Sequence, residues 1–285
     1  MTGRGEGHGK LILCGEHAVV YGHPAIAIAV DRTTRVTLSR RDGATEVRSP
    51  HVDDRVRDAL CTVVPEQGFA VEVETDLPVR RGMGSSAALA VAVVRARADL
   101  AGETIAADEV VHRAMPIERS FHGSPSGVDV AVSAHGGCLW FKRGDPAVHR
   151  SLPSPALPIV VLDSGEDRET ARMVQRVAER RADHAPALDA IGALVERASA
   201  CLDDPETLGP LLLENHALLR SIGVSTGRLD AMVSLAMEHG AHGAKLAGAG
   251  GGGVVMALIE DPESLLAAAR ARNIHAFTCS VWHAG

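Results

Sequence analysis

The chain has 285 residues, 46% of them hydrophobic and 23% charged, which is ordinary for a globular protein of one or two domains. This length can bury a core without disulfides or a structural metal, and no segment approaches the roughly 18 consecutive apolar residues of a membrane-spanning helix. The net charge is −7 and no basic run occurs, which argues against nucleic acid and membrane surfaces as partners.

The cysteines and the N-terminus bear on the compartment. The five cysteines are far apart, odd in number and without a CxxC pair, a pattern that favours a reducing environment and argues against a zinc ribbon. The first residues, MTGRGEGHGKLIL, lack the apolar core of a secretory signal. We therefore expect a cytoplasmic protein.

The first half of the chain alternates β-rich and helical segments. Strand-like segments, branched and alternating, cover residues 11–20, 25–30, 35–39 and 69–75. Helices are predicted over residues 53–64, 85–102 (rich in alanine and capped by serine) and 106–115. A loop over residues 121–127 and a strand over 136–144 are expected to follow.

The second half is mainly helical. The proline density of residues 151–158 predicts a linker, and residues 158–165 then begin a new strand. Helices are predicted over residues 169–184, 186–202, 206–223, 226–240 and 262–272, and strands over 254–260 and 275–282. We therefore expect an α+β chain with two domains, residues 1–155 and 156–285.

The segment PVRRGMGSSAA, residues 78–88, has the character of an anion site. Gly82 and Gly84 let the backbone approach a ligand, and the serines that follow open a helix whose free N–H groups and dipole favour negative charge. Arg80 and Arg81 add positive charge. The string GMGSSA also fits the dinucleotide fingerprint GxGxxA, although DLPVRR separates it from the preceding strand. Phosphate binding and a merely structural serine-capped helix both remain open at this point.

A second glycine segment, KLAGAGGGGVVMAL at residues 245–258, contains GxGxxG at Gly248, Gly250 and Gly253. It precedes a strand and no helix follows, which contradicts a dinucleotide site, and the lack of G-K-[ST] excludes a Walker A motif. Ordering so many glycines costs backbone entropy. This favours close packing against a ligand or against the first glycine segment.

Lysine is rare in this chain. It accounts for three of the 29 basic residues, and Lys10 and Lys245 lie in the glycine-containing segments HGKLILCGEH and HGAKLAGAGGGG. An ammonium group is compact enough to lie beside a phosphate, and we expect that at both positions. Near Lys10, Glu16 and His17 in EHAVV resemble half of HExxH, but the second histidine is missing and a zincin site is excluded. The pair is either structural or part of a binding site.

The segment ERSFHGSPSGVDVA, residues 118–131, is the fourth candidate. Gly123, Pro125 and Gly127 predict a tight loop, and Asp129 follows at the expected start of a helix. Alone, this is a turn with a capping carboxylate. Beside a phosphate loop, Asp129 becomes a candidate base or metal ligand.

Taken together, the four segments resemble the GHMP kinase superfamily. The N-terminal segment, which contains Lys10, narrows the resemblance to the mevalonate kinases. GKLILCGEHAVVYGHPAIA is similar to that family's N-terminal signature, RGMGSSAA to its ATP loop, HGSPSGVD to its substrate and base segment, and KLAGAGGGG to its C-terminal glycine motif. The motifs occur in the family's order across nearly the whole chain. The resemblance implies an N-terminal domain like ribosomal protein S5 domain 2 and a ferredoxin-like C-terminal domain.

The resemblance also implies a reaction: phosphorylation of the 5-hydroxyl of mevalonate, an early step of isoprenoid biosynthesis, with ATP and Mg²⁺ as cofactors. Asp129 then corresponds to the catalytic aspartate, and Lys10 to the lysine that contacts it and the phosphoryl group. Ser86 and Glu118 correspond to the Mg²⁺ ligands, in keeping with the preference of Mg²⁺ for hard oxygen ligands. The implied triphosphate contacts are Arg80, Arg81, Gly82, Met83, Gly84, Ser85 and Ser86. The implied mevalonate contacts are Lys10, Glu16, His17 and Gly248.

The sequence departs from the family pattern at a few positions. Met83 stands where leucine is usual, a volume-conserving change. Ala247 replaces the threonine of KLTGAGGGG, and we expect this to remove a hydroxyl near the substrate, which leaves the acceptor open. The alternatives are a phosphomevalonate kinase, a homoserine kinase (disfavoured by the lysine–aspartate pair) and, from another class, a non-catalytic nucleotide sensor. The segment DSGEDRETARMV resembles a further family stretch that puts Arg168 and Thr170 near the site, and the family implies a homodimer.

Overall fold

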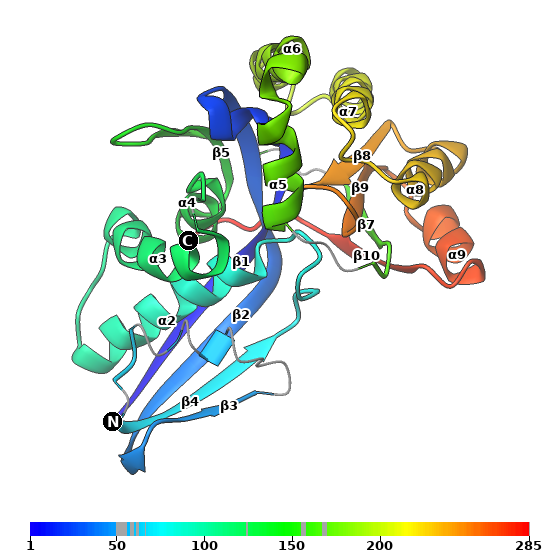
Figure 1. The fold of residues 1–285 in the computed structure, drawn as a ribbon. Helices are drawn as coiled ribbons and strands as arrows, with labels where there is room; N and C mark the ends of the chain where they lie inside the picture. The colour runs from blue at the N-terminus through cyan, green and yellow to red at the C-terminus, as the bar shows by residue number, and fades with distance from the viewer. Residues whose placement is uncertain are drawn as a thin grey trace.

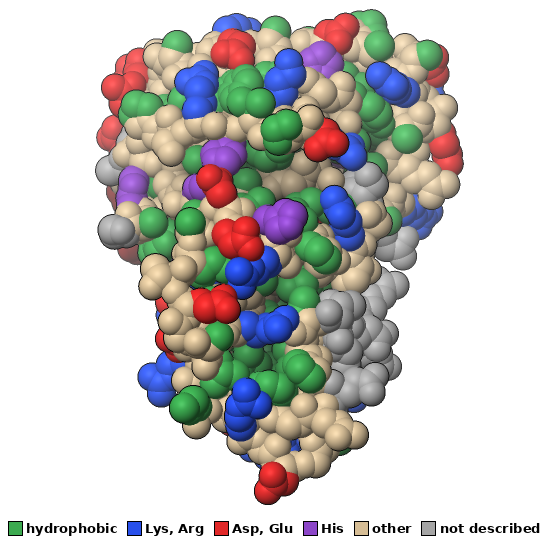
Figure 2. Space-filling model, turned by 90° about the vertical axis from the view of Figure 1, so that its left-hand side faces the viewer, with side chains coloured by type: hydrophobic (Ala, Val, Ile, Leu, Met, Phe, Trp, Pro, Cys, Tyr) green, Lys and Arg blue, Asp and Glu red, His purple; other side chains and the backbone are tan. Residues whose placement is uncertain are grey.

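The structure is a computed structural model, and its strands form two sheets that follow one another along the chain. It describes residues 1–49, 56–57, 60, 63–65, 67–123, 125–154, 158–166 and 170–284. Among the described residues, every helix is too short or too polar to span a lipid bilayer. Basic and acidic side chains are interspersed over the face drawn in Figure 2, with histidines among them.

The first sheet is organised around one long strand. Its order is β3-β4-β2-β5-β6, with β1 also paired to β2. Its strands are β1 (Thr2–Cys14), β2 (Pro24–Ala44), β3 (Glu46–Arg48), β4 (Gln67–Thr75), β5 (Cys138–Lys142) and β6 (Val148–Leu152). The strands predicted over residues 25–30 and 35–39 are both part of β2, because β2 runs through both segments and pairs with β1 over residues 26–39.

Three helices cover one face of this sheet: α2 (Ser85–Ala101), α3 (Ala107–His122) and α4 (Val128–His135) (Figure 1). α2 lies directly on β1, where glycine occupies alternate positions 3, 5 and 7. A Cβ atom at any of these glycines would clash with a carbonyl oxygen of α2, at Ala96, Ala92 and Ala88 respectively. Alternate residues of a strand share a face, and residues four apart share a helix face. The glycine and alanine repeats therefore let the helix backbone rest on the strand backbone.

The second sheet has the order β10-β7-β9-β8 and is antiparallel throughout. Its strands are β7 (Ile159–Asp163), β8 (Gly243–Ala247), β9 (Val254–Leu258) and β10 (His275–Cys279). Its helices are α5 (Thr170–Glu179), α6 (Arg181–Ser199), α7 (Pro205–Ser221), α8 (Gly227–Glu238) and α9 (Glu263–Ala271). The order strand, helices, two strands, helix, strand is that of the ferredoxin-like motif. The predicted α+β class is confirmed.

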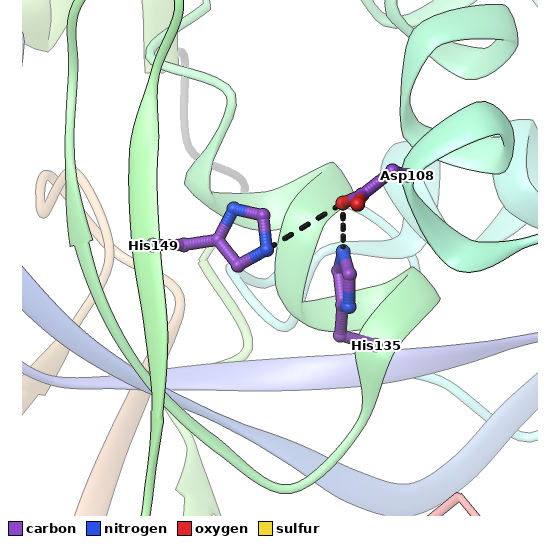
Figure 3. A group of neighbouring side chains, drawn as sticks. All are labelled: Asp108, His135 and His149. Carbon is purple, nitrogen blue, oxygen red and sulfur yellow. Dashed lines mark ion pairs between the residues drawn. The ribbon is translucent and has the colours of Figure 1, made fainter.

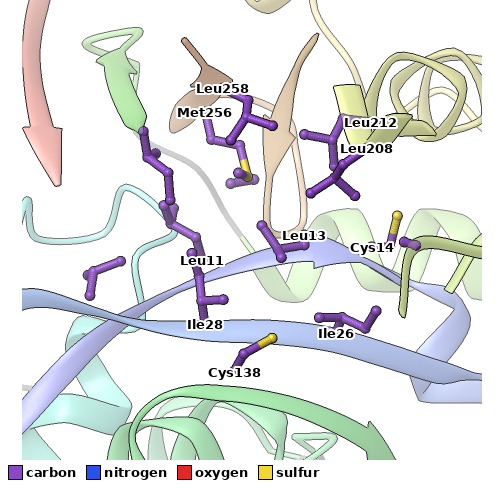
Figure 4. Close-up of a cluster of buried hydrophobic side chains, with 14 of the residues drawn as sticks. Leu11, Leu13, Cys14, Ile26, Ile28, Cys138, Leu208, Leu212, Met256 and Leu258 are labelled. Carbon is purple, nitrogen blue, oxygen red and sulfur yellow. The ribbon is translucent and has the colours of Figure 1, made fainter. Parts of the chain in front are cut away.

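One apolar cluster joins the two sheets (Figure 4). It contains Leu11 and Leu13 of β1 and Ile28 of β2, together with Met256 of β9 and Leu212 of α7, all buried. The predicted division at residue 155 lies among residues 155–157, outside the described ranges, and the domains 1–155 and 156–285 stay a prediction. The shared cluster makes the junction part of the core.

Some predicted boundaries are wrong for local reasons. The strand expected over 11–20 ends at Cys14, because the chain turns at Gly15 (φ 105°) into the short 3-10 helix η1, Ala18–Tyr21. The prediction that a serine caps α2 is also wrong, because the N-cap residue is Gly84 (φ 75°) and no side chain caps the helix. α3 continues to His122, so the predicted loop is shorter.

In the second half, the expected linker begins as β6, a largely exposed edge strand without an alternating apolar pattern. β8 was not predicted, because its sequence GAKLA reads as part of the glycine segment. The break between the first two predicted helices lies at Arg180, and Pro186 is inside α6. The helix predicted over 53–64 falls largely outside the described residues.

Candidate active site

Lys10 of β1 lies at the centre of the candidate site and is only 1% exposed. Its Nζ is 3.0 Å from Oδ2 of Asp129 and donates a 3.2 Å hydrogen bond to the carbonyl oxygen of Gly82. Its backbone N–H donates to the carbonyl of Met83 at 2.8 Å. One lysine on a rigid strand therefore holds both the predicted catalytic aspartate and the first glycine segment.

Asp129 lies in the first turn of α4, which starts where Gly127 (φ 94°) reverses the chain. The Asp129 side chain is 29% exposed, whereas Lys10 is almost completely covered. The carboxylate thus faces solvent on one side and the ammonium group on the other. A hydroxyl-bearing substrate can reach Asp129 without displacing Lys10.

The first glycine segment forms the turn before α2. Gly82 (φ 101°) and Gly84 (φ 75°) have left-handed backbones, and so does Arg80 (φ 62°). A Cβ atom on Gly84 would lie 2.9 Å from Cγ of Lys10, so the glycine is needed for close packing as well as for its φ. Because no side chain caps α2, the N–H groups of its first turn can bind an anion.

The predicted metal ligands meet on the side of the site formed by α2 and α3. Oγ of Ser86 donates to Oε1 of Glu118 at 3.1 Å, and Glu118 is 2% exposed. The second carboxylate oxygen of Glu118, Oε2, is buried and has no hydrogen-bond partner among the described residues. Burial, and then the charge of Asp129, raise the pKa of Glu118 to about 8, against the hydrogen bond from Ser86 and the charge of Lys10. A buried carboxylate with one unsatisfied oxygen beside a hydroxyl fits a divalent cation with hard-ligand preference.

His122 was not predicted to belong to the site. Its Nε2 lies 3.1 Å from Oγ of Ser86 and 3.5 Å from Oε1 of Glu118. The i, i+4 spacing of Glu118 and His122 could have indicated that their side chains lie together on one face of a helix. It was missed because the helix was expected to end at residue 115.

Arg80 and Arg81, the predicted triphosphate contacts, differ in their surroundings. Arg80 is exposed at the turn. Nε of Arg81 lies 3.3 Å from Oδ1 of Asp163, at the end of β7. The first glycine segment is thereby tied to the second sheet.

Glu16 and His17 lie where the N-terminal turn meets the second sheet. Glu16 is 1% exposed and forms an ion pair with Lys245, and its Oε2 accepts a 3.0 Å hydrogen bond from Nδ2 of Asn215. Lys245 also donates to the carbonyls of Ile12 and Leu246. The expectation of a phosphate beside Lys245 is therefore wrong, because buried protein groups occupy its ammonium. Mevalonate contact by Glu16 stays a prediction.

His17 connects the same turn to the second glycine segment. Its Nε2 is 3.0 Å from the carbonyl oxygen of Ala249, next to Gly248 (φ 88°). Ala247 is completely buried in the apolar cluster that joins the sheets, so the expectation that this position faces the substrate is wrong. Arg168 lies outside the described residues, and Thr170 is the first residue of α5.

Comparison with known proteins identifies the class. The family models described as GHMP kinases N terminal domain and GHMP kinases C terminal match residues 52–137 and 190–276. The fold and the site thus define a GHMP kinase. Mevalonate kinase of Thermococcus sibiricus is 36% identical, covering 91% of this chain and 90% of the relative, and that of Pyrococcus abyssi is 37% identical, covering 87% and 86%. The chain belongs to the mevalonate kinases.

Solved structures agree in fold. The crystal structure of L. major mevalonate kinase in complex with R-mevalonate has a TM-score of 0.88 and 27% identity, covering 100% of this chain and 97% of that chain. Streptococcus pneumoniae phosphomevalonate kinase has a TM-score of 0.80 at 16% identity, covering 99% and 100%. The latter likeness concerns the fold alone.

Proposed function

We propose that the protein phosphorylates the 5-hydroxyl of mevalonate with ATP in the presence of Mg²⁺. The observation that carries this proposal is the contact between Lys10 and Asp129 beside the uncapped start of α2. The contact joins a group that can accept a hydroxyl proton to a site for phosphate. Membership of the mevalonate kinases supports mevalonate as the acceptor.

The chain's own groups supply positioning and charge, which phosphoryl transfer mainly requires. Asp129 accepts a hydrogen bond from the attacking hydroxyl, orients it, and takes its proton late in the transfer. Lys10 compensates the carboxylate charge and donates toward the transferring phosphoryl group. The backbone of residues 80–86 holds the triphosphate at the start of α2. Mg²⁺ bound by Ser86 and Glu118 would supply further positive charge at the phosphates.

An acceptor panel tests this function. Purified protein is incubated with ATP and Mg²⁺ and with mevalonate, phosphomevalonate, homoserine or galactose in turn, and release of ADP is measured. We expect turnover with mevalonate, and phosphorus NMR should place the new phosphate on the primary hydroxyl. Preference for another acceptor, or phosphate on the tertiary hydroxyl, would contradict the proposal. Nucleotide binding without turnover of any acceptor would indicate a sensor.

Cellular placement and assembly belong to the same proposal. Four cysteines that the structure describes carry free thiols, and burial raises the pKa of three of them, Cys14, Cys138 and Cys279, to about 12. Unpaired, unreactive thiols support a reducing, cytoplasmic environment. The homodimer stays a prediction, which the mass in solution by light scattering tests.

A further inference from the structure

A cluster of three side chains that the kinase reaction does not use lies around the last residue of α4 (Figure 3), whereas Asp129 is in the first turn of that helix. Asp108 is in the first turn of α3, His135 is the last residue of α4, and His149 is on β6. Both imidazole rings direct Nε2 toward the same carboxylate (Figure 3). Three elements distant in sequence thus converge on one point.

The distances are those of a metal site. Nε2 of His135 is 3.0 Å and Nε2 of His149 is 3.5 Å from Oδ1 of Asp108, and the three ligand atoms lie within 4.8 Å of one another. In a tetrahedral Zn²⁺ site with bonds of about 2.0–2.2 Å, neighbouring ligand atoms are roughly 3.3–3.6 Å apart. The separations between Oδ1 of Asp108 and the two imidazole nitrogens lie near this range.

The state of the histidines also suits a metal. Nε2 of His135 is buried and has no hydrogen-bond partner of ordinary geometry among the described residues. Two imidazoles and one carboxylate are ligands that Zn²⁺ accepts.

A simple histidine–aspartate pair does not account for this arrangement. Such a pair exists elsewhere, between Nε2 of His23 and Oδ1 of Asp189 at 3.2 Å, and it has one imidazole. At Asp108 a second imidazole, with its ring centre 4.4 Å from that of His135, approaches the same oxygen. A cation bound between the two imidazole nitrogens and this carboxylate oxygen would be coordinated by all three groups at once.

We propose that Asp108, His135 and His149 bind one Zn²⁺ ion, with water in the remaining coordination position. The ion clamps the start of α3 and the end of α4 to β6. These are the helices that carry Glu118 and Asp129, so the site acts as a structural brace behind the active site. The inference does not depend on which alcohol the enzyme phosphorylates.

The test is metal binding by the full chain without a histidine tag, after treatment with a chelator. Isothermal titration with Zn²⁺ should show one tight site, and Co²⁺ should give the visible absorption of tetrahedral coordination. Asp108→Asn and His149→Gln, each removing one ligand, should weaken Zn²⁺ binding by more than about 100-fold, since loss even of an outer-shell partner costs roughly 10–100-fold. Zn²⁺ should raise the melting temperature of the parent protein and not that of these variants.

Matched variants separate this site from others. His23→Gln and Asp189→Asn alter the two-residue pair and should leave the tight site intact. Glu118→Gln should also leave it intact, which separates it from the predicted Mg²⁺ ligands. The proposal is overturned if the parent protein binds no Zn²⁺ tightly, or if Asp108→Asn and His149→Gln bind it as well as the parent protein does.

Discussion

At the scale of single residues, the site depends on one lysine that contacts both the predicted catalytic aspartate and the first glycine segment. Lys10 is 1% exposed, and its ammonium contacts Asp129 and the carbonyl of Gly82. A long side chain is held rigidly because β1 and the start of α2 surround it. The pair therefore acts as one unit, in which each charge positions the other.

Substitution of this pair should lower turnover strongly. Asp129→Asn keeps the shape and removes the charge that accepts the proton, and kcat should fall by about 10²–10⁴-fold. Lys10→Met should cost about as much, and the double variant should lose much less than the product of the single losses. Steady-state kinetics measure these effects, with calorimetric ATP binding as the check on folding. Near-normal turnover by folded Asp129→Asn would show that this aspartate has only a structural role in the first turn of α4.

Glu118 should make stability depend on pH in protein free of divalent metal. Its pKa is about 8 in the folded chain against an ordinary value of 4.5, so between these values the folded state holds a proton that the unfolded state releases. The contribution to the free energy of unfolding is therefore greatest at low pH and is lost as pH rises through about 8. The Glu118→Gln variant should lack this pH-dependent contribution to the free energy of unfolding.

Denaturant unfolding in chelator at a series of pH values measures the effect. Between pH 4.5 and pH 9, the free energy of unfolding of Glu118→Gln should rise relative to that of the parent protein by on the order of 3–5 kcal/mol. The comparison cancels groups that titrate in both proteins. Parallel pH profiles would show that Glu118 is ionised in the folded metal-free protein.

At the scale of elements, the contact between β1 and α2 positions the start of α2 beside Lys10. Glycine at positions 3, 5 and 7 and alanine at 88, 92 and 96 bring the two backbones together. Any side chain on the strand would push the helix away. The glycine segment before α2 would then lose its hydrogen bond to the N–H of Lys10.

Gly5→Ala should destabilise the protein, because the new Cβ meets the carbonyl of Ala92. Overpacking of this kind typically costs about 1–3 kcal/mol, and urea unfolding should show it. Gly227→Ala is the matched control: this glycine opens α8, with no neighbour within 4 Å, and should be neutral or slightly stabilising. Equal stability of the two variants would show that α2 does not rest on β1 as described.

At the scale of the whole molecule, a buried ion pair joins the two sheets. Glu16 follows β1 and Lys245 lies on β8, and both are at most 1% exposed. Asn215 of α7 completes the hydrogen bonding. Packing in the apolar cluster of Figure 4 and polar contacts such as Glu16–Lys245 and Arg81–Asp163 therefore hold the two halves of the molecule together.

Removing one partner should be costly, because the other charge is left buried. Lys245→Met should lower the free energy of unfolding by about 3–5 kcal/mol, and adding Glu16→Gln should restore part of that loss. Lys142→Met, at an exposed lysine of β5, is the control and should change stability little. Equal unfolding midpoints for Lys245→Met and Lys142→Met would contradict the role of the pair.

Features that depend on short-range chemistry could be predicted from the sequence. Local spacing specifies turns and helix faces. For this reason the sequence reveals the two glycine segments, Lys10, Asp129 and the alanine-rich helix α2. The four motifs in order were enough to indicate the family and the α+β class. Edge strand β6 and strand β8 were missed, since neither has the alternating apolar pattern on which strand prediction depends.

Which polar groups face one another, in contrast, follows from how the chain packs in three dimensions. Lys10 and Lys245 look alike in sequence, yet one contacts Asp129 and the other is occupied by Glu16. Ala247 was expected at the substrate and is in the core. The brace of Asp108, His135 and His149 had no sequence signal. The physical reason is common to all three: contacts between residues far apart in sequence depend on sheet order and helix packing, which local periodicity does not specify.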